Sequence, residues 1–267
     1  MTNGATEAIY LIAQAFCGSH SAVWIPTFSE YADACRLHGH RVEGISSLEK
    51  LTGNEGIFWL CNPNNPTGQT WDAATLRRLI ATYPRKLFVI DQSYALFTEK
   101  KVLSVAETVK QPNVLLLHSM TKCYAVPGLR LGAVTGSREL LSRIRACRMP
   151  WSVNALAVEA GHYLLQHPGE YRMDIQALLT ERRRVTDALE ALGGVEVLPT
   201  DTHYFLARLQ QGTAAQLKEF LATRHGLLIR DASNFEGLDA RYFRIAIQTE
   251  EENNLLIEGI HEWIQNS

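Results

Sequence analysis

A lysine and an arginine follow one apolar run of the sequence, and together they could hold a phosphorylated aldehyde. The run Asn113–Ser119 has the composition of a buried strand, and Lys122 and Arg130 come after it, eight residues apart. A lysine amine forms a Schiff base with an aldehyde, and an arginine flanked by glycines suits a bidentate grip on phosphate. Ser119 and Thr121 supply hydroxyl donors for the same anion. For Lys122 taken alone, a surface lysine beside an unrelated turn is the commoner explanation.

A carboxylate ends a second apolar run, at Asp91. A carboxylate after such a strand needs a cationic partner, and the pyridinium nitrogen of pyridoxal phosphate is one. In that role Asp91 keeps the nitrogen protonated, so that the ring can absorb electrons from the substrate carbon. Tyr94, three residues later, could reach the phenolic oxygen of the ring. A helix N-cap is an equally good explanation for Asp91 alone.

Three further segments could contribute to the same site. The run Asn62–Gly68 contains two prolines and a glycine, which predicts a stiff turn that presents the amide of Asn65. Ala5 and Thr6 begin a predicted helix, where free backbone N–H groups favour phosphate, although most helix starts bind nothing. Phe28 follows a strand and could stack on an aromatic ring, although a lone aromatic residue is more often part of a core.

Two arginines in the second half of the chain are candidates for binding a substrate anion. Arg230 is predicted to close a strand, and Arg244 lies inside the apolar strand Tyr242–Ile247. A buried arginine needs an anion, which a substrate carboxylate or phosphate would provide. An internal salt bridge is the alternative for either arginine.

The elements that must position these residues alternate between strand and helix in the first half. Short apolar runs predict strands at 21–25, 41–45, 56–61, 86–91, 113–119 and 131–135, with helices predicted at 5–16, 29–38, 72–83 and 137–147. This alternation predicts an α/β fold with a mainly parallel sheet and helices on both faces. Ligands bind at the carboxyl ends of such strands.

The second half predicts a smaller α+β unit. Helices are expected at 153–166, 170–192, 214–225 and 250–264, with strands at 195–198, 204–209, 227–230 and 242–247. We therefore divide the chain into a large cofactor-binding domain, 1–152, and a connecting long helix with a small domain, 153–267.

Composition excludes several other classes of function. The net charge of -2 draws the chain neither to nucleic acid nor to an anionic membrane, and no stretch approaches the roughly 20 apolar residues of a membrane span. The five cysteines include no Cys-x-x-Cys pair, which favours a reducing cytoplasm. We expect no metal site, since His38 and His40 are best explained as a solvent-facing pair. Nucleotide-binding glycine motifs are absent from the sequence.

Together these residues resemble the fold-type I pyridoxal-phosphate enzymes, the aminotransferase class I/II superfamily. The resemblance covers essentially the whole chain and implies a role for each matching position. Lys122 matches the lysine that bonds to the cofactor aldehyde, Asp91 the partner of the ring nitrogen, and Arg244 the arginine that takes the substrate carboxylate. The other matches are Tyr94 and Asn65 at the phenolic oxygen, Phe28 at the stacking position, and Ala5, Thr6, Ser119 and Arg130 in the phosphate cup.

Within that superfamily the chain is most similar to threonine-phosphate decarboxylases of cobalamin synthesis. The run 149–154 (Met-Pro-Trp-Ser-Val-Asn), within the segment 149–157, is the most specific, and it is supported by the segments 119–130 and 228–238 with 241–244. The resemblance implies decarboxylation of L-threonine O-3-phosphate, a small-molecule substrate, by a cytoplasmic homodimer. The alternative is an aminotransferase of the histidinol-phosphate type. Family members carry a further N-terminal segment, so the other alternative is a shortened chain that binds cofactor with little activity.

Overall fold

The structure, a computed structural model, describes residues 1–53, 56–171 and 173–266. Within them, seven strands form one sheet in the order β1-β7-β6-β5-β4-β2-β3. Its strands are β1 (Thr2–Asn3), β2 (His20–Trp24), β3 (Arg41–Ile45), β4 (Ile57–Cys61), β5 (Leu87–Asp91), β6 (Val114–Ser119) and β7 (Leu131–Gly136). Strands β3, β2, β4, β5 and β6 pair in parallel, whereas β7 and β1 are antiparallel to their neighbours. The predicted mainly parallel α/β fold is confirmed.

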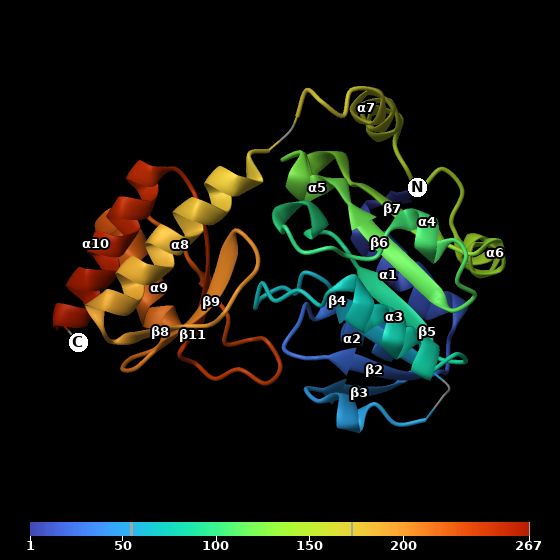
Figure 1. The fold of residues 1–267 in the computed structure, drawn as a ribbon, viewed down its shortest axis with the longest axis horizontal. Coiled ribbons are helices and arrows are strands. Elements are labelled where there is room, and N and C mark those ends of the chain that lie inside the picture. The colour runs from blue at the N-terminus through green and yellow to red at the C-terminus, as the bar shows by residue number, and fades with distance from the viewer. Residues whose placement is uncertain (54–55, 172, 267) are drawn as a thin grey trace.

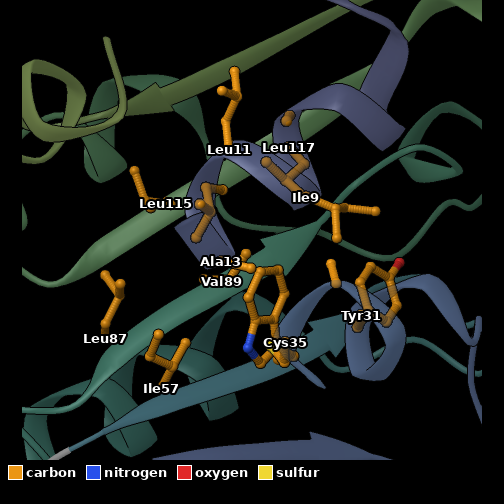
Figure 2. Packing of buried hydrophobic residues seen from close by; sticks show 14 of the residues in the cluster. Ile9, Leu11, Ala13, Tyr31, Cys35, Ile57, Leu87, Val89, Leu115 and Leu117 are labelled. Atoms are coloured by element: carbon orange, nitrogen blue, oxygen red, sulfur yellow. The ribbon is translucent and has the colours of Figure 1, made fainter. Parts of the chain in front are cut away.

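Helices cover both faces of this sheet (Figure 1). They are α1 (Gly4–Ala15), α2 (Glu30–Leu37), α3 (Ala73–Thr82), α4 (Val105–Thr108), α5 (Met120–Cys123) and α6 (Arg138–Cys147). Successive residues of β4 face opposite sides, so Trp59 packs with α1 and α2 while Phe58 packs with α3. Figure 2 shows the first of these cores, in which Ile9 and Ala13 of α1 belong to one cluster with Leu117 and Val89 of the sheet. Burial on both faces explains why the central strands are apolar throughout.

The second half of the described chain forms a four-stranded antiparallel sheet in the order β10-β11-β9-β8. Its elements are α8 (Ile175–Leu192), β8 (Val195–Val197), β9 (Tyr204–Leu209), α9 (Ala214–His225), β10 (Arg230–Asp231), β11 (Tyr242–Ala246) and α10 (Glu250–Asn266). Along β11, Phe243 and Ile245 pack into a core with the three helices. Arg244 lies between them in the strand and therefore faces the opposite side, toward the large sheet.

Two predicted elements of this half begin more than two residues later in the structure. The helix predicted at 170–192 begins at Ile175, because Asp174 caps it by accepting from the N–H of Ala177; Arg172 lies outside the described residues. The strand predicted at 227–230 was misplaced, since β10 begins at Arg230. The N–H of Leu227 instead bonds back to Leu221 O and closes the end of α9.

Helix α7 (Ala155–Gln166) bears on the domain division, which stays a prediction. It lies beside the large sheet in Figure 1, and Gly161 packs directly against Leu131 of β7. Helix α8 leads from this region into the small unit (Figure 1). Helix α7 therefore contacts the large sheet, although the predicted division assigns it to the second domain.

Candidate active site

One cavity of about 330 Å³ brings all twelve predicted site residues together, although they come from segments spread over most of the chain. It lies at the carboxyl ends of β4, β5 and β6 and is closed on one side by β10 and β11. The predicted residues that line it are Ala5, Thr6, Phe28, Asn65, Asp91, Tyr94, Ser119, Thr121, Lys122, Arg130, Arg230 and Arg244. A cavity of this size suits a small organic cofactor with its substrate.

Hydroxyl, guanidinium and backbone N–H groups converge at one end of the cavity. Ser119 Oγ and Thr121 Oγ1 lie 2.7 Å apart and share a hydrogen bond. The Arg130 guanidinium lies against Gly4, the first residue of α1, where an added Cβ would come 2.5 Å from Nη2. Gly4 also has φ +80°, in the region that favours glycine. The absence of a side chain therefore lets the arginine reach a helix N-terminus, where an anion is favoured.

The buried carboxylate of Asp91 lies in the same cavity and is held by neutral donors. Tyr31 donates its hydroxyl to Oδ2 at 2.7 Å, and Ser93 donates to Oδ1 from its backbone N–H at 2.8 Å and from its hydroxyl at 2.5 Å. Burial, and then the charge of Asp91, raise the pKa of Tyr31 well above its usual value. Tyr31 therefore stays protonated and donates to the carboxylate.

Lys122 lies on α5, one turn after β6 ends. As a whole residue it is exposed to the cavity, yet the surrounding protein removes part of the water around its ammonium. That desolvation, followed by the positive charges of Arg244 and Arg130, lowers the pKa of Lys122. A lowered pKa increases the fraction of free amine, the form that attacks an aldehyde.

The turn Asn62–Gln69 and strand β11 meet over the cavity. Arg244 donates from Nη1 to Asn65 Oδ1, and its guanidinium lies 5.4 Å from the ring centre of Tyr204. Tyr94 packs edge-on against Tyr204 with ring centres 4.9 Å apart. Burial raises the pKa of Tyr94 to about 12, so its hydroxyl is a donor at neutral pH.

Arg230 differs from its predicted environment. It was expected to be a buried arginine, but it is exposed and opens β10, where it donates to Asn234 Oδ1 at 3.0 Å. It stands directly opposite Arg244 in the β10–β11 ladder. Two like charges in opposite positions destabilise a sheet, so an anion between them would relieve the repulsion.

Sequence reasoning missed several residues that line the cavity. Tyr31 and Ser93, which hold Asp91, were not predicted, nor were Cys61, Ile9 and Phe235. Tyr31 lies three residues after Phe28, at the start of a helix. That spacing alone does not distinguish a residue that lines the site from one that packs in the core. Its contact with Asp91, 60 residues away in sequence, exists only in the fold.

These groups fit pyridoxal phosphate on the evidence of the cavity itself. The cradle between Gly4, Arg130 and Ser119 would be filled by a single Cβ at Gly4, and it presents donors suited to a phosphate. The buried Asp91 carboxylate makes no ion pair with a lysine or arginine of the described residues, and it lies where a pyridinium nitrogen would give it one. Lys122 borders the same space and would bond to the aldehyde.

No helix within the described residues is long and apolar enough to cross a membrane. The same residues contain no group of three or more His, Cys, Asp or Glu side chains that could hold a metal ion.

Comparisons with known proteins point to one family. The family model for aminotransferase class I and II matches residues 1–260. The threonine-phosphate decarboxylase of Salmonella typhimurium is 32% identical, over 97% of this chain and 74% of its own. Among solved structures, L-threonine-O-3-phosphate decarboxylase from Porphyromonas gingivalis is similar with a TM-score of 0.96 and 40% identity, over 99% of this chain and 82% of that one. The histidinol-phosphate aminotransferase from Clostridium acetobutylicum gives 0.89 and 25%, over 100% and 83%.

Proposed function

The chain belongs to the aminotransferase class I and II family, and we propose that it decarboxylates a phosphorylated amino acid, L-threonine O-3-phosphate. The observation that carries this proposal is the pair Arg230 and Arg244, which stand opposite each other on the cavity wall. They belong to the second sheet, whereas Gly4 and Arg130, which would take the cofactor phosphate, adjoin the first. Two further cations suit a substrate with two anionic groups, a carboxylate and a phosphate. The names of the Salmonella and Porphyromonas relatives support the same substrate.

Enzymes of this family depend on pyridoxal phosphate, which when bound accepts the electron pair left on the substrate α carbon. The protein determines which bond of that carbon breaks, because the bond perpendicular to the ring is the one weakened. Holding the carboxylate perpendicular favours loss of CO2, whereas holding the hydrogen there favours transamination. The cations that grip the substrate therefore select the reaction.

The two arginines differ in position, and we assign them different groups. Arg244 borders both the main cavity and a second chamber that also contains Lys122. The substrate amine must approach the aldehyde at the place where Lys122 bonds. The α-carboxylate is attached to the same carbon as that amine, so we assign the carboxylate to Arg244, which borders the same space. Arg230 does not border that second chamber and is exposed at the outer wall. It is therefore the partner of the more distant phosphate.

Lys122 has a second task once the substrate amine has displaced it. Its amine would then border the α carbon and, after taking up a proton from solvent, would return that proton to the carbon once CO2 has left. The lowered pKa of Lys122 increases the fraction of free amine, the form that bonds to the aldehyde in the first of these tasks. The product is an amino alcohol phosphate.

The reaction is tested by incubating the protein with pyridoxal phosphate and L-threonine O-3-phosphate, and measuring CO2 and keto acid separately. We expect CO2 in amounts equal to the amino alcohol phosphate. Keto acid as the sole product contradicts decarboxylation. In Lys122→Ala we expect the yellow colour of the lysine-bound cofactor to disappear and turnover to fall by at least about a hundredfold.

An aminotransferase of the histidinol-phosphate type is the second candidate. Its support is the similarity to the Clostridium structure and the fact that transamination needs the same cofactor residues. The same assay with histidinol phosphate and 2-oxoglutarate distinguishes it, because transamination releases glutamate and no CO2.

We also propose that the protein acts as a cytoplasmic homodimer. Large apolar side chains are exposed around α7, among them Met149 at 73%, Trp151 at 96% and Leu156 at 75%. Large exposed apolar side chains gathered in one segment of the chain are typical of an interface. The described cysteines are all free, which suits a reducing compartment.

A further inference from the structure

His203 is a titratable group at the active site that the proposed reaction has not used. It precedes β9 and lines a chamber of about 430 Å³ together with Lys122, Tyr94 and Arg244. Its ring stacks on Phe97 with centres 4.0 Å apart at 30°. The imidazole is therefore held in one orientation by packing rather than by a hydrogen bond.

The two ring nitrogens of His203 have different surroundings. Nδ1 is buried and has no hydrogen-bond partner. Nε2 also makes no hydrogen bond with the described residues, but it is not enclosed, so it faces the chamber. A buried N–H without an acceptor costs more free energy than a buried nitrogen lone pair without a donor. The proton therefore belongs on Nε2, the ring nitrogen that is not enclosed.

The imidazole is neutral at physiological pH. Burial, and then the positive charge of Arg244, lower the pKa of His203 to about 4. A neutral histidine of this tautomer offers the chamber one N–H donor and no charge.

The carboxylate site at Arg244 is incomplete without a further donor. The Arg244 guanidinium already donates a hydrogen bond from Nη1 to Asn65 Oδ1, and its Nε is buried without a partner. Only some of the guanidinium N–H groups of Arg244 remain for a ligand. A carboxylate bound there therefore needs a further hydrogen-bond donor from another side chain for its second oxygen. His203 borders the same chamber as Arg244, and its Nε2–H is free.

We propose that His203 is a substrate-contacting residue whose Nε2–H binds the second oxygen of the α-carboxylate held by Arg244. This rests on the proposed function for the position of that carboxylate. The contact is chemically suited to decarboxylation. Loss of CO2 removes the negative charge from the carboxylate, so a second cation there would stabilise the starting state and slow the reaction. A neutral donor fixes the direction of the carbon–carbon bond without adding that charge.

The test uses ligands that cannot react, on the protein loaded with pyridoxal phosphate. One is 3-(phosphonooxy)butanoate, which is the substrate without its amine, and the other is propan-2-yl phosphate, which also lacks the carboxylate. Calorimetric Kd values are compared for the wild type, His203→Phe and His203→Gln. Phenylalanine keeps the stack on Phe97 but has no donor, whereas glutamine places an N–H near the position of Nε2.

We expect His203→Phe to weaken binding of the carboxylate ligand about tenfold and to change binding of propan-2-yl phosphate by less than twofold. In His203→Gln we expect most of the lost affinity to return. Equal weakening of both ligands, no weakening of either, a glutamine variant as poor as the phenylalanine variant, or a wild type that does not bind the carboxylate ligand would each overturn the contact. Because neither ligand reacts, these outcomes are separate from the CO2 assay, which decides the proposed reaction on its own.

Discussion

At the scale of single residues, the site is organised around a buried acid and a partly desolvated base. Asp91 is buried, and in the part of the chain that the structure describes its partners are hydroxyl and backbone donors rather than cations. Neutral donors orient a carboxylate without neutralising it. The negative charge is therefore kept for a cationic ligand, and a cofactor with a pyridinium nitrogen provides that cation.

Removing the hydroxyl of Tyr31 should weaken cofactor binding. Tyr31→Phe keeps the ring stacked on Trp59 but leaves Asp91 Oδ2 without its donor. Hydrogen bonds to charged groups contribute about 1.5–3 kcal/mol, so we expect the Kd for pyridoxal phosphate to rise roughly tenfold or more. The matched control is Ser93→Ala, which should cost less, because the Ser93 backbone N–H still donates to Oδ1. A Tyr31→Phe variant with wild-type affinity would contradict this role.

In the cofactor-free protein, we expect Lys122 to lower the free energy of unfolding, because its pKa is lower in the folded chain than the usual 10.5. Below the lowered pKa, Lys122 is protonated in both the folded and the unfolded chain, and the loss of stability has its full value. As pH rises from there toward 10.5, the folded chain loses its proton while the unfolded chain keeps it, so stability increases. We expect Lys122→Met to raise the urea midpoint at pH 7.5, with a smaller gain at pH 10. Lys218→Met, at an exposed lysine on α9, is the control and should show no such difference.

At the scale of elements, the ends of strands and the starts of helices create the binding groups. Strands β4, β5 and β6 are parallel and end at one edge, so Asn65, Asp91 and Ser119 arrive together although the chain separates them. The antiparallel strand β7 then carries Gly132 close to the start of α1, where a Cβ would meet the backbone of Gly4. This close approach fixes the helix N-terminus beside Arg130.

Gly4→Ala tests that approach directly. The new Cβ would collide with the Arg130 guanidinium, and φ +80° adds backbone strain of about 1–2 kcal/mol. Gly18→Ala is a matched control, because Gly18 has φ +71° but no atom within 4 Å of an added Cβ. We expect both variants to lose similar backbone stability in urea unfolding, and Gly4→Ala alone to lose affinity for pyridoxal phosphate, by at least about tenfold. Equal affinities in the two variants would rule out the proposed cradle.

At the scale of the whole molecule, polar contacts join the small unit to the turn that carries Asn65. Asp201 accepts the N–H of Thr70 at 2.8 Å and pairs with Lys100 at 2.9 Å, while its own N–H donates to Gly68 O at 3.0 Å. Tyr204 donates its hydroxyl to Asn64 O at 2.9 Å. These bonds fix β9 and β11, and with them Arg244, over the cofactor pocket of the large sheet.

Asp201→Ala should therefore affect the substrate more than the cofactor. Loss of the acceptor leaves the buried backbone N–H of Thr70 unsatisfied and frees the turn, at a cost of about 1–3 kcal/mol. We expect KM to rise several-fold, the cofactor Kd to rise by a smaller factor through the turn that carries Asn65, and hydrogen exchange in residues 62–70 to become faster. Asp33→Ala removes an exposed ion pair on α2 and is the control. Equal effects on KM and cofactor affinity would argue against this coupling.

The sequence by itself determined the fold class and predicted twelve residues that the fold brings to one cavity. The apolar runs at 56–61 and 86–91 indicated strands covered on both faces, and their alternation with helices required crossover connections, hence parallel pairing. That topology brings the polar ends to one edge. The spacing from Lys122 to Arg130 is local, so it was visible before any fold was known.

Only the tertiary structure decided the contacts that tune those residues. Tyr31 on Asp91, the Arg130 guanidinium on Gly4 and the free Nε2 of His203 depend on distances between elements that are remote in sequence. The misplaced strand before Arg230 has the same cause, because capping of α9 by Gly226 and Leu227 competes with strand propensity. The local hydrophobic pattern indicates which face of a helix or strand is apolar. The hydrogen-bond partners of its polar groups depend instead on how the elements pack together.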